Sequence, residues 1–159
     1  MSERSVTHAT FCIERTYDAS PARVFTAFAD PIAKAKWFRG PDEWARDQIA
    51  FDFRVGGREK LASRPPNGPA HIFDCVYRDI VPNQRIVYTY DMYSGETNTS
   101  VSITTIEFKP AGGGTKLVFT EQGVFLDGLA SAAEREAGTR NGLIVKLGAA
   151  LEAEAVHAR

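Results

Sequence analysis

NGLIVKLGAAL, residues 141–151, is the stretch that decides how this chain folds. The surrounding region, from about residue 128 to about residue 156, is rich in alanine and contains no proline, as a continuous helix requires. One apolar stripe at helical spacing is made of Leu143, Ile144, Leu147 and Leu151. The sequence therefore predicts one long C-terminal helix with a face that must be buried.

Before this helix, apolar residues alternate with polar ones in the pattern of β-strands. Turn residues such as Gly56-Gly57 and Pro82-Asn83 separate the runs, so the strands follow one another as antiparallel hairpins. In the sixth strand the apolar parity changes between Ile103 and Ile106, which predicts a bulge near Thr104-Thr105. The predicted strands are about Thr10–Tyr17, Gln48–Val55, Arg58–Arg64, Ala70–Val81, Ile86–Met92, Thr99–Lys109 and Leu117–Glu121.

Two short helices are expected between the first and second strands. Ser20-Pro21 and Asp30-Pro31 each combine an N-cap side chain with a proline at the first helical position. Only the C-terminal helix is long enough to cover the apolar face of the sheet. The expected fold is α+β, a curved antiparallel sheet of about seven strands wrapped around that helix. Residues 1–159 are expected to form a single domain, with an N-terminal tail of about residues 1–9.

A cavity is expected between the sheet and the helix, because a cylinder of about 10 Å diameter cannot fill the concave side of a bulged, twisted sheet. Such a cavity suits a small apolar or amphipathic ligand. Its expected lining is aromatic on the sheet side and aliphatic on the helix: Trp37, Phe51, Phe53, Phe73, Tyr88, Tyr90, Phe119, Leu143, Ile144 and Leu147.

Three charged residues are candidates for the polar end of this cavity. Stepping back along the apolar stripe of the helix reaches Arg140 and Glu136, which would then face the sheet. Alternatively, Gly138 and Gly142 interrupt the helix, rotate its first half and leave both charges in water. Glu121 shares parity with apolar residues of the last strand, so it is either an inward carboxylate that must be paired or protonated, or the end of the strand in solvent.

Composition excludes several classes of partner. Nineteen basic and twenty acidic residues give a formal charge of -1, so no basic field attracts nucleic acid or anionic lipid.

Neither a signal peptide nor a membrane-spanning stretch is apparent, and the expected location is the cytoplasm, without membrane insertion. Cys12 and Cys75 are far apart in strand-like runs, so two buried free thiols are expected rather than a disulfide.

Five segments spread over most of the chain share one family pattern. They are Ser20–Phe28 with Asp30-Pro31 and Trp37, Phe53–Gly57, Val76–Thr89, Gly114–Leu117 and Phe119–Gly123. In this order they resemble the START-like, SRPBCC or helix-grip superfamily. Among its members, the chain is most similar to bacterial homologues of the activator of the heat-shock chaperone ATPase. Relatives often carry Gly-Trp in the final helix, whereas here Gly142 precedes Leu143.

The resemblance implies further expectations about partners. Ligand binding in the cavity is the favoured function, and Arg54 and Arg58 are implied as partners of Glu121. A chaperone contact through an exposed face is an alternative. It is the less expected one, because relatives named for that activity usually have an additional N-terminal domain, and this sequence begins almost directly at the first strand. Dimers among the relatives imply that a homodimer is one option.

Catalytic chemistry is only weakly indicated. No nucleophile with a base is visible, the three histidines are scattered, and no cluster of His and Cys suggests a metal, so no cofactor is expected. Residues 112–116, Gly-Gly-Gly-Thr-Lys, lack the order of a phosphate loop and predict a hairpin turn. Some relatives are cyclases or hydrolases, and for that alternative the candidate acids and bases are Glu121, His71, Tyr88 and Glu136.

Overall fold

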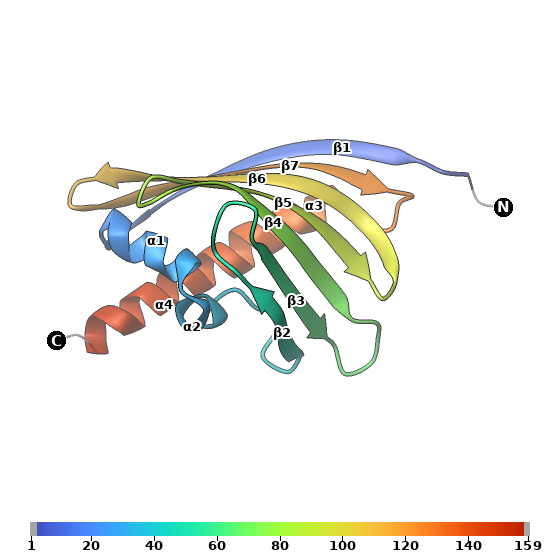
Figure 1. Cartoon of the computed structure of the whole chain (residues 1–159), viewed down its shortest axis with the longest axis horizontal. Coiled ribbons are helices and arrows are strands. Elements are labelled where there is room, and N and C mark those ends of the chain that lie inside the picture. Colours follow the sequence, from blue (N-terminus) through green and yellow to red (C-terminus); the bar gives the residue numbers. More distant parts are fainter. Residues whose placement is uncertain (1–2, 158–159) are drawn as a thin grey trace.

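The computed structural model describes residues 3–157 and contains one seven-stranded sheet and a set of helices packed on its concave side (Figure 1). The strand order is β1-β7-β6-β5-β4-β3-β2, and every neighbouring pair is antiparallel, as predicted. The strands are β1 (Val6–Tyr17), β2 (Ala45–Phe51), β3 (Arg58–Arg64), β4 (His71–Val81), β5 (Arg85–Ser94), β6 (Thr97–Ala111) and β7 (Gly114–Leu126). The helices are α1 (Pro21–Ala29), α2 (Pro31–Ala35), α3 (Ala132–Gly138), the π turn η1 (Thr139–Leu143) and α4 (Ile144–His157).

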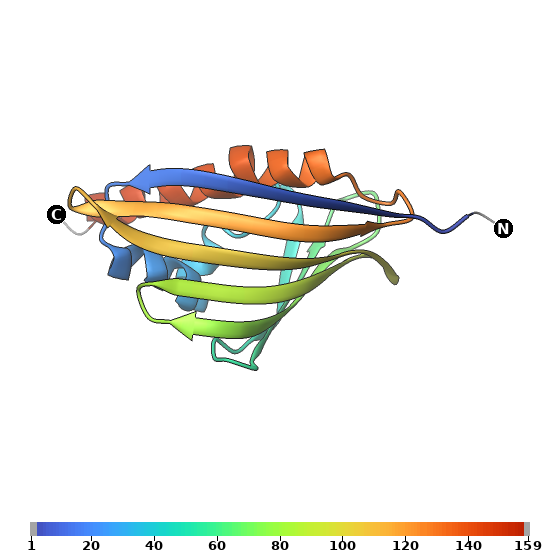
Figure 2. The ribbon, with the colours of Figure 1, turned by 90° about the horizontal axis from the view of Figure 1, so that it is seen from above.

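The sheet arches over the C-terminal helices, and β2 and β3 curl down beside them (Figure 1). Seen from above, β1, β7, β6 and β5 run side by side along the length of α3 and α4 (Figure 2). This is the helix-grip architecture expected from the sequence. Within residues 3–157, no helix is long and apolar enough to cross a membrane.

The two short helices begin where the capping signals predict. The Ser20 side chain accepts a hydrogen bond from the Arg23 backbone N–H, and Pro21 opens α1. The Asp30 carboxylate accepts from the Ile32 backbone N–H at the start of α2. Each cap satisfies a backbone donor that the first turn of a helix leaves free.

The C-terminal helix packs on the sheet through the predicted apolar stripe. Ile144, Leu147 and Leu151 are buried. Two side chains from the other end of the chain bond to the backbone of α4: the Tyr17 hydroxyl donates to the carbonyl of Ile144 at 2.8 Å, and the Arg23 guanidinium donates to that of Leu151 at 3.0 Å. The second half of the helix is therefore fixed both by packing and by bonds to α1 and β1.

The first half of the C-terminal helix differs from the prediction. The π turn η1 inserts one residue, so the stripe that runs back from Ile144 continues through Thr139 and Arg135. Glu136 and Arg140 are rotated away from the sheet, about 40% of each side chain is exposed, and they pair with each other at 3.0 Å. The expectation that these two charges face the sheet is wrong, and the alternative of an interrupted helix is correct.

Strand β6 also departs from its predicted pattern. Ser100, Ser102 and Thr104 face inward, whereas Val101 and Ile103 are more than 40% exposed on the outer face. The parity is constant through Phe108, and the register shift of this strand lies near Thr99, opposite the step from Met92 to Tyr93. The predicted bulge at Thr104-Thr105 is therefore wrong, because the inner face of the strand is polar over this stretch.

Smaller corrections concern strand ends and one cysteine. Strand β1 begins at Val6, earlier than predicted, because its pairing with β7 extends to Leu126. Strand β2 also starts earlier and ends at Phe51, so Val55 lies in the exposed turn that follows. Both thiols are free and Cys75 is buried, but Cys12 is exposed because it lies on the outer face of the edge strand β1.

Candidate functional site

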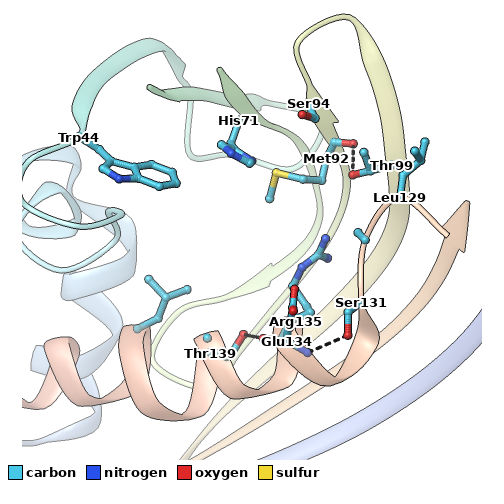
Figure 3. Close-up of a pocket in the computed structure, with 13 residues that line it drawn as sticks. Trp44, His71, Met92, Ser94, Thr99, Leu129, Ser131, Glu134, Arg135 and Thr139 are labelled. Carbon is cyan, nitrogen blue, oxygen red and sulfur yellow. Dashed lines mark hydrogen bonds between the residues drawn. The ribbon is translucent and has the colours of Figure 1, made fainter. Parts of the chain in front are cut away.

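A cleft of about 520 Å³ opens between the first half of the C-terminal helix and the inner face of the sheet (Figure 3). We call it the main cleft. Strands β4 and β5, the start of β6 and the segment that precedes β2 form one wall, and α3 with η1 forms the other. Its lining consists of Trp44, His71, Met92, Ser94, Thr99, Leu129, Ala130, Ser131, Glu134, Arg135, Gly138, Thr139 and Leu143.

A second, smaller cleft of about 230 Å³ adjoins the main cleft, and its lining is mostly apolar. We call it the side cleft. The two clefts share Trp44, His71, Met92 and Leu143, and the side cleft adds Phe38, Arg39, Gly40, Leu61, Ser63 and Phe73. The shared residues place the two clefts side by side, and we call the pair the hollow.

An aromatic pair lies where the two clefts meet. The Trp44 indole stacks on the His71 imidazole, with ring centroids 5.3 Å apart and planes 23° from parallel. In Figure 3 these rings and Met92 line the sheet side, while Arg135 points toward them from the helix. A ligand in this hollow would meet flat apolar surfaces on one side and a cation on the other.

Arg135 is the buried cation of the main cleft, and only 15% of its side chain is exposed, whereas Glu134, which also lines the cleft, is exposed. Its Nη1 donates to the Tyr90 hydroxyl at 2.8 Å, and its Nη2 donates to Ser100 Oγ at 2.9 Å. The guanidinium also lies over the rings of Tyr90 and Phe125, at 5.6 and 5.2 Å from their centroids. These contacts hold Arg135 in one orientation.

Behind Arg135 lies Glu121, which is 4% exposed and so confirms the inward alternative. Its Oε2 accepts from the Tyr90 hydroxyl at 2.8 Å, and its Oε1 accepts from Thr104 Oγ1 at 2.9 Å. Burial raises the pKa of the Glu121 carboxyl above its ordinary value, although these hydrogen bonds and the charge of Arg135 oppose the rise. Among residues 3–157, the nearby Ser102 Oγ is buried without a hydrogen-bond partner.

The arginines implied as partners of Glu121 are elsewhere. Arg54 pairs with Asp52, and Arg58 pairs with Asp74, both at the surface. The residue that approaches Glu121 is Arg135, whose Nη1 lies 3.7 Å from Oε2. The prediction of Arg54 and Arg58 is wrong because the first half of the helix, not the β2–β3 hairpin, closes over this part of the sheet.

Of the predicted lining residues, Phe73 and Leu143 border the hollow. Most of the others fill the interior: Trp37, Phe53, Tyr88, Tyr90, Phe119, Ile144 and Leu147 pack into the core cluster. Phe51 is partly buried at the end of β2, with the Lys34 ammonium 5.9 Å from its ring centroid. The space predicted to be open is therefore largely occupied by the aromatic rings themselves.

The four candidate acids and bases are not brought together. His71 lines the hollow, Glu121 and Tyr88 are buried behind it, and Glu136 lies outside. Among the described residues, no group of three or more His, Cys, Asp or Glu side chains is placed to hold a metal ion. The arrangement offers a shaped surface with two cations, Arg135, which two side-chain hydrogen bonds hold in the main cleft, and Arg39, which borders the side cleft. Such a surface suits binding.

Sequence reasoning missed the cleft residues Trp44, Met92, Thr139 and above all Arg135. Arg135 and Thr139 each stand one position before a residue that was predicted to face the sheet. The two glycines at positions 138 and 142 were the available signal, because a break between them changes which face of the first half is buried.

A second buried polar group lies away from the clefts. Lys34 Nζ contacts Glu59 Oε1 at 2.6 Å, and the Tyr77 hydroxyl donates to the same oxygen at 2.5 Å. Lys34 and Glu59 are at most 2% exposed, and the ammonium lies 4.4 Å from the centroid of the Phe38 ring. Burial, followed by the charge of Glu59, raises the pKa of Tyr77. This cluster ties α2 to β3 and β4.

Comparison with known proteins agrees with the fold. The model of the family described as Activator of Hsp90 ATPase homolog 1-like protein matches residues 18–154. The chain belongs to this family. The matched residues include every residue that lines the two clefts. No protein with a curated description matches the chain.

Solved structures similar to this family member cover nearly its full length. The Mll3558 protein from Rhizobium loti is 48% identical, with a TM-score of 0.83 over 92% of this chain and 99% of that chain. An uncharacterized protein from Rhizobium leguminosarum is 45% identical, with a TM-score of 0.87 over 95% and 99% of the two chains. The CV1439 protein from Chromobacterium violaceum is 30% identical, with a TM-score of 0.78 over 90% and 96%.

Proposed function

We propose that the protein binds a small amphipathic molecule in the adjoining clefts, with the apolar part against Trp44, Phe73 and Leu143 and the polar end toward Arg135. The observation that carries this proposal is the hollow itself, which has mostly apolar walls at one end, where Arg39 is also part of the lining, and a buried, oriented cation at the other. Small-molecule sites are typically hollows of about 300–1,000 Å³ that are mostly apolar with a few placed polar groups.

The geometry favours an amphipathic ligand over a purely apolar one. A hydrocarbon that filled both clefts would cover Arg135 and remove its remaining N–H groups from water without replacing their hydrogen bonds. Leaving such donors unsatisfied costs about 1–3 kcal/mol for a neutral group and more for a charged one. A π turn is also frequent at functional sites in helices, and here it turns Arg135 toward the cleft.

The proposal is tested by filling the hollow. Leu143 borders both clefts, so Leu143→Trp adds volume where a ligand would lie. Titration with the fluorescent probe 8-anilinonaphthalene-1-sulfonate should show affinity for the variant reduced by at least about tenfold, a loss of roughly 1.4 kcal/mol. Thermal unfolding of the free variant checks that it is folded.

Val145→Trp is the matched control, because Val145 lies two residues further along and is 48% exposed on the outer side of the helix. This variant should bind the probe like the unmodified protein. Equal probe affinity in both tryptophan variants and the unmodified protein would place the binding site elsewhere and overturn the proposal.

A second candidate is suggested by the family description, which names activation of the Hsp90 ATPase. A contact of this kind would use an exposed face and leave the hollow free. Addition of the purified protein to a bacterial Hsp90-type chaperone should then raise its rate of ATP hydrolysis, and Leu143→Trp should raise it equally. An unchanged rate at saturating concentration removes this candidate.

The remaining expectations belong to the same proposal. Cytoplasmic location agrees with a free, exposed Cys12, which a reducing compartment would keep as a thiol. A homodimer is the assembly implied by relatives, and sedimentation velocity would measure it.

A further inference from the structure

Arg135 keeps hydrogen-bonding capacity that the fold does not use. A guanidinium carries five N–H donors in a fixed planar arrangement. Among residues 3–157, Arg135 makes two side-chain hydrogen bonds, to the Tyr90 hydroxyl and to Ser100 Oγ. The side chain borders the main cleft, so its other donors are available to a group that enters there. Planar paired donors of this kind match the two oxygens of a carboxylate.

Glu121 does not occupy these donors. The Tyr90 hydroxyl stands between the two charges, because it accepts from Arg135 and donates to Glu121 Oε2. The direct distance from Arg135 Nη1 to Glu121 Oε2 is 3.7 Å, which is too long for a hydrogen bond. An acceptor that reaches Arg135 from the cleft therefore need not displace Glu121.

A ligand carboxylate would change the charge balance of this buried site. Arg135 and Glu121 now neutralise each other, and a second carboxylate would leave two anions beside one cation. Two carboxylates in one site favour protonation of one of them. Glu121 is the group already disposed to take the proton, since burial raises its pKa. Glu134, the acidic residue that lines the cleft itself, is exposed to water.

The added proton has a place in the existing hydrogen-bond network. Glu121 Oε2 would continue to accept from the Tyr90 hydroxyl. Oε1 would carry the proton and donate it to Thr104 Oγ1, because a hydroxyl can accept as readily as it donates. The groups that face Glu121 from the neighbouring elements are Tyr88 and Tyr90 of β5, Thr104 of β6, Phe11 of β1 and Arg135 of α3.

We infer that the ligand is a carboxylic acid whose carboxylate binds Arg135, and that Glu121 takes up one proton when this ligand binds. The inference rests on the proposed function and names the chemical class of its ligand. The proton comes from solvent, and no covalent bond other than this O–H bond forms.

Three probes with the same eight-carbon tail test the head group: octanoate, octan-1-ol and octylamine. Calorimetric titration at pH 7 should give an affinity for octanoate at least about tenfold higher than for octan-1-ol, with octylamine weakest. Octanoate stays ionised between pH 6 and pH 8, since free carboxyl groups titrate near pH 4–5. Over this range its affinity should fall with rising pH by up to about tenfold per unit, because one proton enters with each ligand.

Variants identify the group that takes the proton. Glu121→Gln should bind octanoate with an affinity that no longer changes between pH 6 and pH 8. His71→Asn should retain the pH dependence, which excludes the histidine in the cleft as its source. Glu136→Gln, an acid on the same helix but outside the cleft, is the matched control and should behave like the unmodified protein. Repeating the titrations in buffers of different ionisation heat counts the protons directly.

The outcomes separate the two proposals. Equal affinity for octanoate and octan-1-ol, or no proton uptake, overturns the inference and leaves ligand binding intact. Failure of all three probes overturns the inference as well, and if 8-anilinonaphthalene-1-sulfonate also binds Leu143→Trp as it binds the unmodified protein, the proposed function fails with it.

Discussion

Lys34 and Glu59 show how a pair of charged side chains can belong to the core. Their contact of 2.6 Å is closed to solvent, and Tyr77 shares the same carboxylate oxygen. Nothing in the sequence distinguishes Lys34 from a surface lysine of a five-residue helix, because its partners come from β3 and β4. A buried ion pair contributes little net stability when both partners are present, but a single partner left behind is costly.

Lys34→Met should therefore lower the free energy of unfolding by about 3–5 kcal/mol, since it leaves Glu59 buried without its cation. Urea denaturation followed by circular dichroism measures the change. Arg140→Ala removes the exposed partner of Glu136 and should cost no more than about 0.5 kcal/mol. If the two variants lose similar stability, the buried pair is not a structural determinant.

Glu121 illustrates what parity in a strand can and cannot predict. Its alternation with Leu117 and Phe119 was correct, and β7 continues past it to Leu126. Sequence could not choose between a buried carboxylate and a strand end, because the choice depends on groups far away in the chain. Tyr90, Thr104 and Arg135, which make burial tolerable, come from three other elements.

Among the secondary-structure elements, the C-terminal helix was predicted best in its second half, where a regular apolar stripe packs on the sheet. The stripe from Ile144 to Leu151 follows ordinary helical spacing and is buried as expected. The π turn before it has no such pattern. It is favoured by tertiary contacts, in which Arg135 bonds to Tyr90 and Ser100, and by the Thr139 hydroxyl, which donates to the Arg135 carbonyl at 2.9 Å.

Two glycines of this helix should respond oppositely to alanine. A Cβ at Gly142 would meet nothing within 4 Å, so Gly142→Ala should raise the free energy of unfolding by up to about 1 kcal/mol through helix propensity. A Cβ at Gly148 would lie 3.2 Å from Tyr17 Cε1, and that ring is held by its bond to Ile144. Gly148→Ala should therefore lower stability by about 1 kcal/mol. Urea denaturation measures both changes. If the two variants shift the urea midpoint in the same direction from that of the unmodified protein, this account is wrong.

Strand β6 was misread for a related reason. Hydrophobic alternation assigns the apolar face of a strand to the core. Val101 and Ile103 form such an apolar face, but they lie on the exposed side of the strand. The inner positions of this stretch are hydroxyl residues because they lie beside Glu121 and Arg135. A polar patch inside a protein reverses the pattern that sequence reasoning uses.

For the molecule as a unit, the fold was predictable and the open space was not. The order of elements and the antiparallel connections follow from turn residues and periodicity. Alternation along a strand, however, identifies only which residues face inward. It does not tell which of these residues fill the interior and which border a cleft. Tyr88 and Phe119 fill it, whereas Phe73 and Met92 border the hollow. Only the packed arrangement separates the two groups.

The stacked Trp44 gives this protein an optical property. Its only other tryptophan, Trp37, is sealed in the core and donates its indole N–H to the Ala27 carbonyl. Trp37 emission should therefore stay constant while the molecule remains folded. The Trp44 indole borders both clefts, so a molecule that entered would replace water against it. Trp37 emission can thus serve as an internal reference, and Trp44 emission should report ligand binding. No attached dye is needed to measure how much of the hollow is occupied.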